Sequence, residues 1–98
     1  MRPNILLITS DQHRADHLSC MGTPGFNTPN FDRMAREGAH FNRAYTPCPI
    51  CTPCRMSLLT GQYPSRHGAY SIGVSVDPFP TTTLPSVLND AGYHTALF

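Results

Sequence analysis

An α/β fold with a largely parallel sheet is the class that this sequence predicts, and two observations near its start carry the prediction. Residues 4–9 read Asn-Ile-Leu-Leu-Ile-Thr, a short run that is apolar on both faces. Continuous apolarity of this length is typical of a buried strand in a parallel sheet. Polar residues follow at once, at the carboxyl end where such sheets place their ligands. We therefore expect a sheet sandwiched between helices.

The polar segment after this strand holds the first candidate site residue. It reads Ser-Asp-Gln-His-Arg-Ala-Asp over residues 10–16. Asp11 is a candidate ligand from its position alone, although a lone Asp after a strand is more often a turn or cap residue. Asp16 is expected to cap a turn or to pair with a neighbour such as Arg14.

The next elements are a helix and a second strand. Thr28 is suited to cap a helix whose first residue is Pro29, and Gly38 is suited to end it. The buried stripe of this helix is expected to comprise Phe31, Met34 and Ala35. Residues 39–45 alternate in part between apolar and polar side chains, which predicts a strand.

A second helix is expected after a rigid, cysteine-rich loop at residues 47–53. Thr52 is suited to cap it, with Pro53 as its first residue and Gly61 as its stop. Its inward-facing residues are expected to be Met56, Leu58 and Leu59.

The remaining sequence predicts a loop, a short helix and the start of another strand. Residues 62–80 are dense in Gly, Pro and Ser, residues 84–90 suit a helix closed by Gly92, and residues 93–98 are strand-like. A domain does not usually end inside an apolar strand. We therefore expect residues 1–98 to be the N-terminal part of a larger domain, truncated at its C-terminus.

Composition excludes several classes of function. Charged residues make up 13% of the 98 residues, about half of the roughly 25% that is usual. This hints that further protein covers much of the surface. Seven Arg and no Lys give a net charge of +1 without a basic stripe, which argues against nucleic-acid binding. The first apolar run is too short for a signal sequence or a membrane span, so the sequence predicts a cytoplasmic protein without membrane contact.

Cys51 and Arg55 form the strongest candidate site. Cys51 lies at the start of the second expected helix, where unpaired amide groups and the helix dipole create a positive potential. Arg55 follows one helical turn later and can reach back to the same point. Its guanidinium fork suits sulfate or phosphate. Local physics alone thus predicts an anion pocket beside a potential nucleophile.

Residues 51–61, Cys-Thr-Pro-Cys-Arg-Met-Ser-Leu-Leu-Thr-Gly, resemble the signature of the sulfatase family. In that signature Cys, Pro, Arg and the final Leu-Thr-Gly are fixed, and each of them matches. Residues 4–11, 28–41 and 84–95 also resemble segments of the family. The resemblance implies an alkaline-phosphatase-like, three-layer α/β sandwich with a mostly parallel sheet, of which this chain supplies the N-terminal part of the catalytic domain.

The resemblance also implies a mechanism, hydrolysis of sulfate esters. Cys51 would be converted by a maturation enzyme to formylglycine, whose hydrated aldehyde attacks sulfur and expels the alcohol of a small-molecule or sugar sulfate ester. Arg55 would hold the hydrated group. Asp11, Gln12 and the group derived from Cys51 would ligate a divalent metal, with calcium expected first and magnesium or manganese as alternatives.

Two departures from the family pattern leave questions open. Many sulfatases carry paired Asp residues where this chain has Asp11 and Gln12. The run Asp-Gln-x-Arg is similar to a branch that includes phosphonate monoester hydrolases, so a phosphonate or phosphodiester substrate is the alternative. The family's Gly-Lys-x-His motif usually lies further downstream, and this chain has no Lys. We expect the 98 residues alone to be inactive.

A non-catalytic metal-binding or structural module is the alternative hypothesis to an enzyme. Cys48, Cys51 and Cys54 follow a C-x2-C-x2-C spacing that suits an iron–sulfur or zinc module, with Cys20 or His67 as a further ligand. That reading leaves Arg55 and the Leu-Leu-Thr-Gly run unexplained. His67 is also a candidate for the mouth of the substrate site. The other histidines are expected to be structural or surface residues, and they are His13, His17, His40 and His94.

Overall fold

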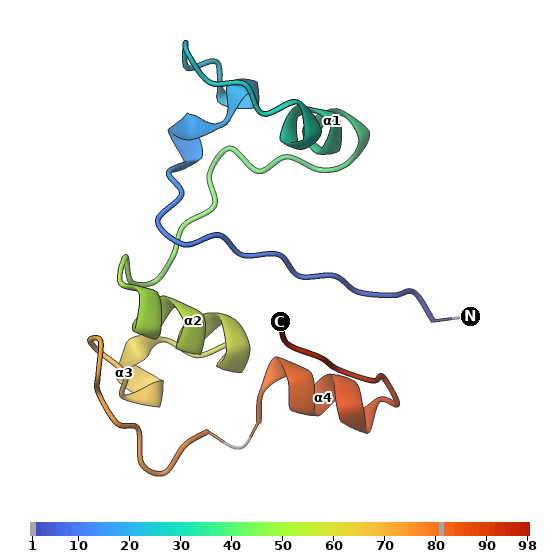
Figure 1. Cartoon of the computed structure of the whole chain (residues 1–98). Coiled ribbons are helices and arrows are strands. Elements are labelled where there is room, and N and C mark those ends of the chain that lie inside the picture. The colour runs from blue at the N-terminus through green and yellow to red at the C-terminus, as the bar shows by residue number, and fades with distance from the viewer. Residues whose placement is uncertain (1, 81) are drawn as a thin grey trace. The chain divides into compact units, whose positions relative to one another are not determined.

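The computed structural model describes residues 2–80 and 82–98, which divide into two compact units, Met1–Ala44 and Tyr45–Phe98. Every element found is a helix or a single helical turn (Figure 1). In chain order these are η1 (Ala15–His17), η2 (Ser19–Met21), α1 (Pro29–Glu37), α2 (Cys51–Thr60), α3 (Pro64–His67) and α4 (Leu84–Asp90). The first three belong to the first unit and the last three to the second.

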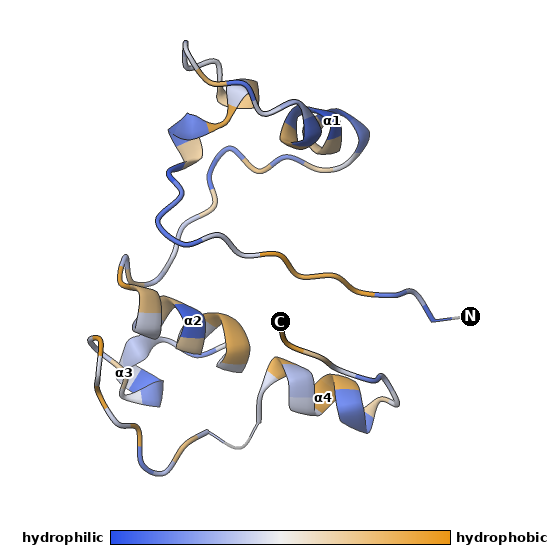
Figure 2. Cartoon of the chain, viewed as in Figure 1, coloured by the Kyte–Doolittle hydropathy of each residue, from blue (hydrophilic) through white to orange (hydrophobic). Residues whose placement is uncertain are grey.

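The prediction of strands is wrong for the part of the chain that the structure describes. Residues 4–9, 39–45 and 93–98 contain no strand there. The apolar run of the first segment follows an extended course (Figure 2). Its side chains are exposed, and Leu6 is 84% exposed. A strand exists only where a neighbouring strand accepts its backbone hydrogen bonds. No segment takes that place among the described residues.

In the first unit, Ser19 ties the turn η2 to the start of α1. Its amide donates to Thr28 Oγ1 at 2.9 Å, while the Thr28 amide donates to Ser19 Oγ at 2.8 Å. The Ser19 hydroxyl also donates to the Asp32 carboxylate at 2.8 and 2.9 Å. Thr28 is the N-cap residue of α1, and Pro29 its first residue, as predicted. However, the Thr28 hydroxyl bonds to Ser19 rather than to an amide of α1.

The predicted buried stripe of α1 is wrong. Phe31 is 46% exposed and Met34 is 61% exposed, and α1 has no buried residue. Within the first unit the helix packs on η2, a single turn too short to cover an apolar face of this length. Phe31 meets one aromatic neighbour, His13, with ring centroids 6.1 Å apart in an edge-to-face arrangement.

In the second unit, α2 begins earlier than the sequence predicted. Cys51 is its first helical residue and the extended Ile50 is its N-cap, so Thr52 is not the cap and Pro53 is not the first residue. Proline is tolerated here because the amides of a first helical turn have no partner within the helix. The predicted stop is confirmed, since Gly61 takes the left-handed conformation with φ of 67°.

A small buried cluster joins α2 to α3, which lies in a region that the sequence predicted as loop. Pro53 is fully buried, Ala69 is 0% exposed and His67 is 3% exposed. Ser57 completes the cluster from the centre of α2, at 9% exposure. The predicted inward residues of α2 are only partly covered: Leu58 is 46% exposed, while Met56 and Leu59 are half-buried.

The predicted helix α4 is confirmed with its bounds. Thr83 caps it through a capping box, in which Thr83 Oγ1 accepts from the Ser86 amide at 3.3 Å and Ser86 Oγ accepts from the Thr83 amide at 2.8 Å. Gly92 follows with φ of 82°. No helix in the described ranges is long and apolar enough to span a membrane.

Candidate active site

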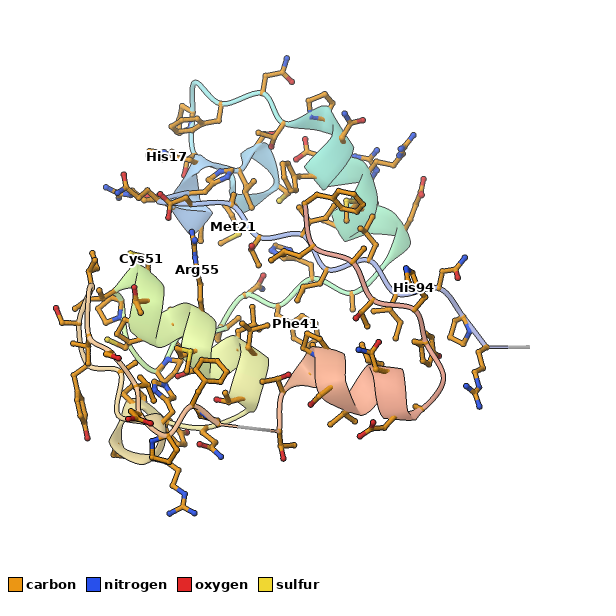
Figure 3. All side chains as sticks on the ribbon, turned by 60° about the horizontal axis from the view of Figure 1, so that its bottom comes forward. His17, Met21, Phe41, Cys51, Arg55 and His94 are labelled. Carbon is orange, nitrogen blue, oxygen red and sulfur yellow. The ribbon has the colours of Figure 1, made fainter. Side chains whose placement is uncertain are left out.

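The first two turns of α2 carry the strongest candidate residues. Cys51 opens the helix with an exposed thiol, and Arg55 follows four residues later on the same face (Figure 3). Side chains four residues apart on a helix are neighbours. The structure therefore brings the predicted nucleophile and the predicted anion-binding guanidinium together on one exposed helical surface.

The backbone at this end of α2 offers few donors to an anion. The Cys54 amide already donates to the Ile50 carbonyl at 2.9 Å, and Pro53 has no N–H group. Within the described residues, the amides of Cys51 and Thr52 are the donors of the first turn that can face a ligand. Recognition of an anion here would depend on Arg55 more than on the backbone.

His67 lies behind α2 and supports it from within the fold. Its Nδ1 accepts the Ala69 amide at 3.1 Å, and its Nε2 lies 3.0 Å from Ser57 Oγ. Because Nδ1 accepts, the proton of the neutral ring is on Nε2, which donates to the Ser57 hydroxyl. The interpretation of His67 as a residue at the substrate mouth is wrong, since the ring is 3% exposed.

Ser57 is the site-supporting residue that the sequence reasoning missed. It occupies a variable position of the sulfatase-like motif at residues 51–61. A serine inside a helix does not by itself indicate a functional role. The signal that could have found Ser57 is its pairing with His67. The next residue, Gly68, ends α3 in the left-handed conformation with φ of 77°. That pairing is visible only once α3 is known to exist.

Asp11 and Gln12 form a polar bend after the N-terminal extended segment, and both are exposed. Gln12 adopts a φ of 52°, a left-handed conformation that residues other than glycine seldom take. Just beyond, the Arg14 guanidinium donates to Asp16 at 2.6 and 2.9 Å, which confirms the predicted pair. That hydrogen bond lowers the pKa of the Asp16 carboxyl and raises the pKa of Arg14.

The chemistry of Asp11 and Gln12 fits a hard divalent cation, because carboxylate and amide oxygens are the donors that calcium and magnesium prefer. The number of donors falls short of a complete site. No group of three or more His, Cys, Asp or Glu side chains that could hold a metal occurs in residues 2–80 and 82–98. The same finding counts against an iron–sulfur or zinc module built on Cys48, Cys51 and Cys54.

The predicted site residues thus fall into two pairs. Asp11 and Gln12 belong to the first unit, whereas Cys51 and Arg55 belong to the second. Each pair is adjacent within its own unit. The meeting of both pairs around one metal ion stays a prediction.

Comparison with known proteins extends over nearly the whole chain. The family model described as Sulfatase matches residues 3–98. The arylsulfatase of Clostridium perfringens is 45% identical, with 97% of this chain and 20% of the relative aligned. Human arylsulfatase A is 41% identical over 97% of this chain and 20% of its own length. Human N-acetylgalactosamine-6-sulfatase is 39% identical over 93% of this chain and 20% of its own length.

The chain therefore spans about a fifth of the length of these curated relatives. No solved structure matches it significantly.

Proposed function

Because the chain belongs to the sulfatase family, we propose that the complete protein hydrolyses sulfate esters and that Cys51 supplies its nucleophile after conversion to formylglycine. The observation that carries the proposal is the pairing of Cys51 and Arg55 on one exposed face at the start of α2. An exposed thiol is accessible to a maturation enzyme. The neighbouring guanidinium of Arg55 would hold an anionic substrate next to the formylglycine that this conversion produces.

Arg55 has two tasks in this proposal. Its planar fork donates two parallel hydrogen bonds to the oxygens of a sulfate group and so orients the sulfur towards position 51. Its fixed positive charge also offsets the negative charge that the oxygens gain as the ester bond breaks. Arg55→Lys keeps the charge and loses the fork, so we expect a large fall in turnover even from this conservative change.

We further propose that Asp11 and Gln12 hold a divalent cation, with calcium as the expected ion and magnesium or manganese as alternatives. Such an ion, held by Asp11 and Gln12, would supply Lewis-acid polarisation of the ester oxygens. The left-handed backbone of Gln12 supports a built site, because strained conformations in folded proteins gather at functional positions. The group derived from Cys51 is the further ligand that this proposal expects.

The substrate class is tested by comparing two model esters. We expect the complete protein to release sulfate from a chromogenic aryl sulfate faster than it cleaves the matching aryl phosphonate monoester. The opposite order would favour the phosphonate or phosphodiester alternative, which the sequence Asp-Gln-x-Arg at residues 11–14 supports. A sugar sulfate extends the comparison to natural leaving groups.

The nucleophile is tested by mass and by substitution. Trypsin releases residues 44–55 as one peptide, and conversion of the thiol to the aldehyde lowers its mass by about 18 Da. We expect Cys51→Ala to abolish sulfate release while the protein stays folded. Cys48→Ala, which changes a half-buried thiol outside α2, is the matched control and should remain active. Unchanged turnover in Cys51→Ala would refute the proposal.

A further inference from the structure

A second cysteine lies one helical turn from the proposed nucleophile. Residues 51–54 read Cys-Thr-Pro-Cys and form the first turn of α2. Both thiols are free, with Cys51 exposed and Cys54 half-buried. Residues three apart on a helix have Cβ atoms about 5–6 Å apart. A disulfide requires about 3.5–4.5 Å between these atoms, so a modest movement closes the gap.

The position of Cys51 makes this movement easy. As the first residue of α2 it has no intrahelical bond at its amide, so its backbone is tied to the helix only through its carbonyl. The other half of the turn is firmly held. Pro53 is fully buried, and the Cys54 amide donates to the Ile50 carbonyl at 2.9 Å. The exposed thiol of Cys51 is thus one helical turn away from a thiol whose backbone is firmly held.

We propose that Cys51 and Cys54 form a reversible disulfide that protects Cys51 from conversion to formylglycine. The disulfide itself depends only on the geometry of α2, whereas its consequence for maturation rests on the function proposed above. Cys54 occupies a variable position of the family motif, between the fixed Pro53 and Arg55. A resolving thiol at that position therefore leaves the motif intact.

The chemistry balances with a small-molecule disulfide such as oxidised glutathione as the oxidant. The Cys51 thiolate attacks one sulfur of the oxidant, forms a mixed disulfide and releases one glutathione thiolate. The Cys54 thiolate then attacks Cys51 Sγ, forms the internal S–S bond and releases the second glutathione. The protein loses two hydrogen atoms in all, about 2 Da, and the oxidant gains them as two thiols.

Cys48 is the competing partner, and the backbone disfavours it. It precedes the helix, and the extended Ile50 separates it from Cys51, so no helical turn sets the two thiols side by side. The Cys48 backbone is instead held by Thr46, whose hydroxyl donates to the Cys48 carbonyl at 2.8 Å. Cys48 thus serves as the internal control for the pairing.

The first experiment tests the disulfide alone. The complete protein with unconverted Cys51 is equilibrated in oxidised and reduced glutathione, alkylated and digested with trypsin. In oxidising buffer we expect the 44–55 peptide to carry one alkyl group, on Cys48, and to contain a Cys51–Cys54 bond. Cys48→Ser should keep the bond, and Cys54→Ser should leave only the glutathione adduct on Cys51. Three alkylated thiols under oxidising conditions, or a bond that includes Cys48, would overturn the proposal.

The second experiment tests the consequence. Oxidised and reduced protein are incubated with a formylglycine-generating enzyme, and the loss of about 18 Da from the 44–55 peptide is followed. We expect conversion of the reduced protein, none of the oxidised protein, and recovery after dithiothreitol. Equal conversion of both forms would overturn the protective role. No conversion of the reduced protein would refute the proposed nucleophile and leave the disulfide result standing.

Discussion

Replacing His67 is the perturbation whose effect the structure specifies most fully. The ring is 3% exposed and makes two hydrogen bonds, one to Ser57 on α2 and one from the Ala69 amide. It is the polar centre of the small buried cluster that joins α3 to α2. His67→Ala removes both bonds and strands two buried polar groups, the Ser57 hydroxyl and the Ala69 amide.

The expected cost follows from those two groups. A buried donor or acceptor that loses its partner costs about 1–3 kcal/mol. Two such groups would cost about 2–6 kcal/mol, and water entering the space left by the ring offsets part of this, so we expect a loss of about 2–4 kcal/mol in the free energy of unfolding. That is a large share of the roughly 5–15 kcal/mol by which folded proteins are stable.

Two conservative variants measure separately how much each of the two hydrogen bonds of His67 contributes to the free energy of unfolding. In His67→Asn the side-chain oxygen can take the place of Nδ1 and accept the Ala69 amide, while Ser57 loses its donor. In His67→Gln the amide nitrogen can take the place of Nε2 and reach Ser57, while Ala69 loses its acceptor. Each should cost about half as much as His67→Ala, roughly 1–2 kcal/mol.

The assay combines urea unfolding of the complete protein with amide hydrogen exchange at Ala69. Unfolding gives the total cost, and exchange reports the bond to Nδ1 separately. We expect the Ala69 amide to lose protection in His67→Ala and His67→Gln and to keep it in His67→Asn. Two results would refute the reasoning. One is a free energy of unfolding in the variants equal to that of the unsubstituted protein. The other is the same protection of the Ala69 amide in all three His67 variants.

Three further predictions concern other parts of the chain. Thr83→Ala should remove the capping box of α4 and cost about 1 kcal/mol in urea unfolding, whereas Thr82→Ala, at the exposed neighbouring residue, should be close to neutral. The Arg14 hydrogen bond lowers the pKa of Asp16, so its contribution to stability is present above the unfolded carboxyl's pKa and is lost as pH falls through the folded value. Carbon-13 NMR titration should show that pKa rise in Arg14→Gln; an unchanged value would contradict the ion pair. Asp11→Asn should weaken calcium binding measured by calorimetry, because it removes a charged oxygen ligand, and unaltered affinity would remove Asp11 from the site.

The sequence predicted α1, α2 and α4 because their signals are local, whereas it predicted loop where α3 lies. Thr28 and Pro29 mark the start of α1, Gly61 marks the end of α2, and residues 84–90 became α4 with the expected bounds. The error at the start of α2 has the same origin. Thr52-Pro53 is a good local signal for a cap and first residue, but the extended Ile50 closes the first turn two residues earlier through its bond from Cys54.

The candidate site was likewise predictable only where its residues are close together in the sequence. Cys51 and Arg55 are four residues apart on one helix, so their proximity follows from helical geometry alone. The Ser57–His67 bond joins residues on two different helices and was missed. The meeting of Asp11 with Cys51 is longer in range still, because the two residues belong to different units. It therefore remains a prediction that only the arrangement of the complete protein can test.

The strands predicted at residues 4–9, 39–45 and 93–98 are absent from the described residues because an apolar pattern alone does not form a strand. Membership of the sulfatase family implies an alkaline-phosphatase-like α/β fold, and the apolar run at residues 5–8 has the composition of a central strand. Its four side chains are between 55% and 84% exposed. Burying each would contribute about 1.5–3 kcal/mol, or roughly 6–12 kcal/mol for the run. A helix obtains its hydrogen bonds from its own residues, whereas this gain requires strands on both sides and helices on both faces. The apolar composition of residues 5–8 alone therefore does not produce a strand in the part of the chain that the structure describes.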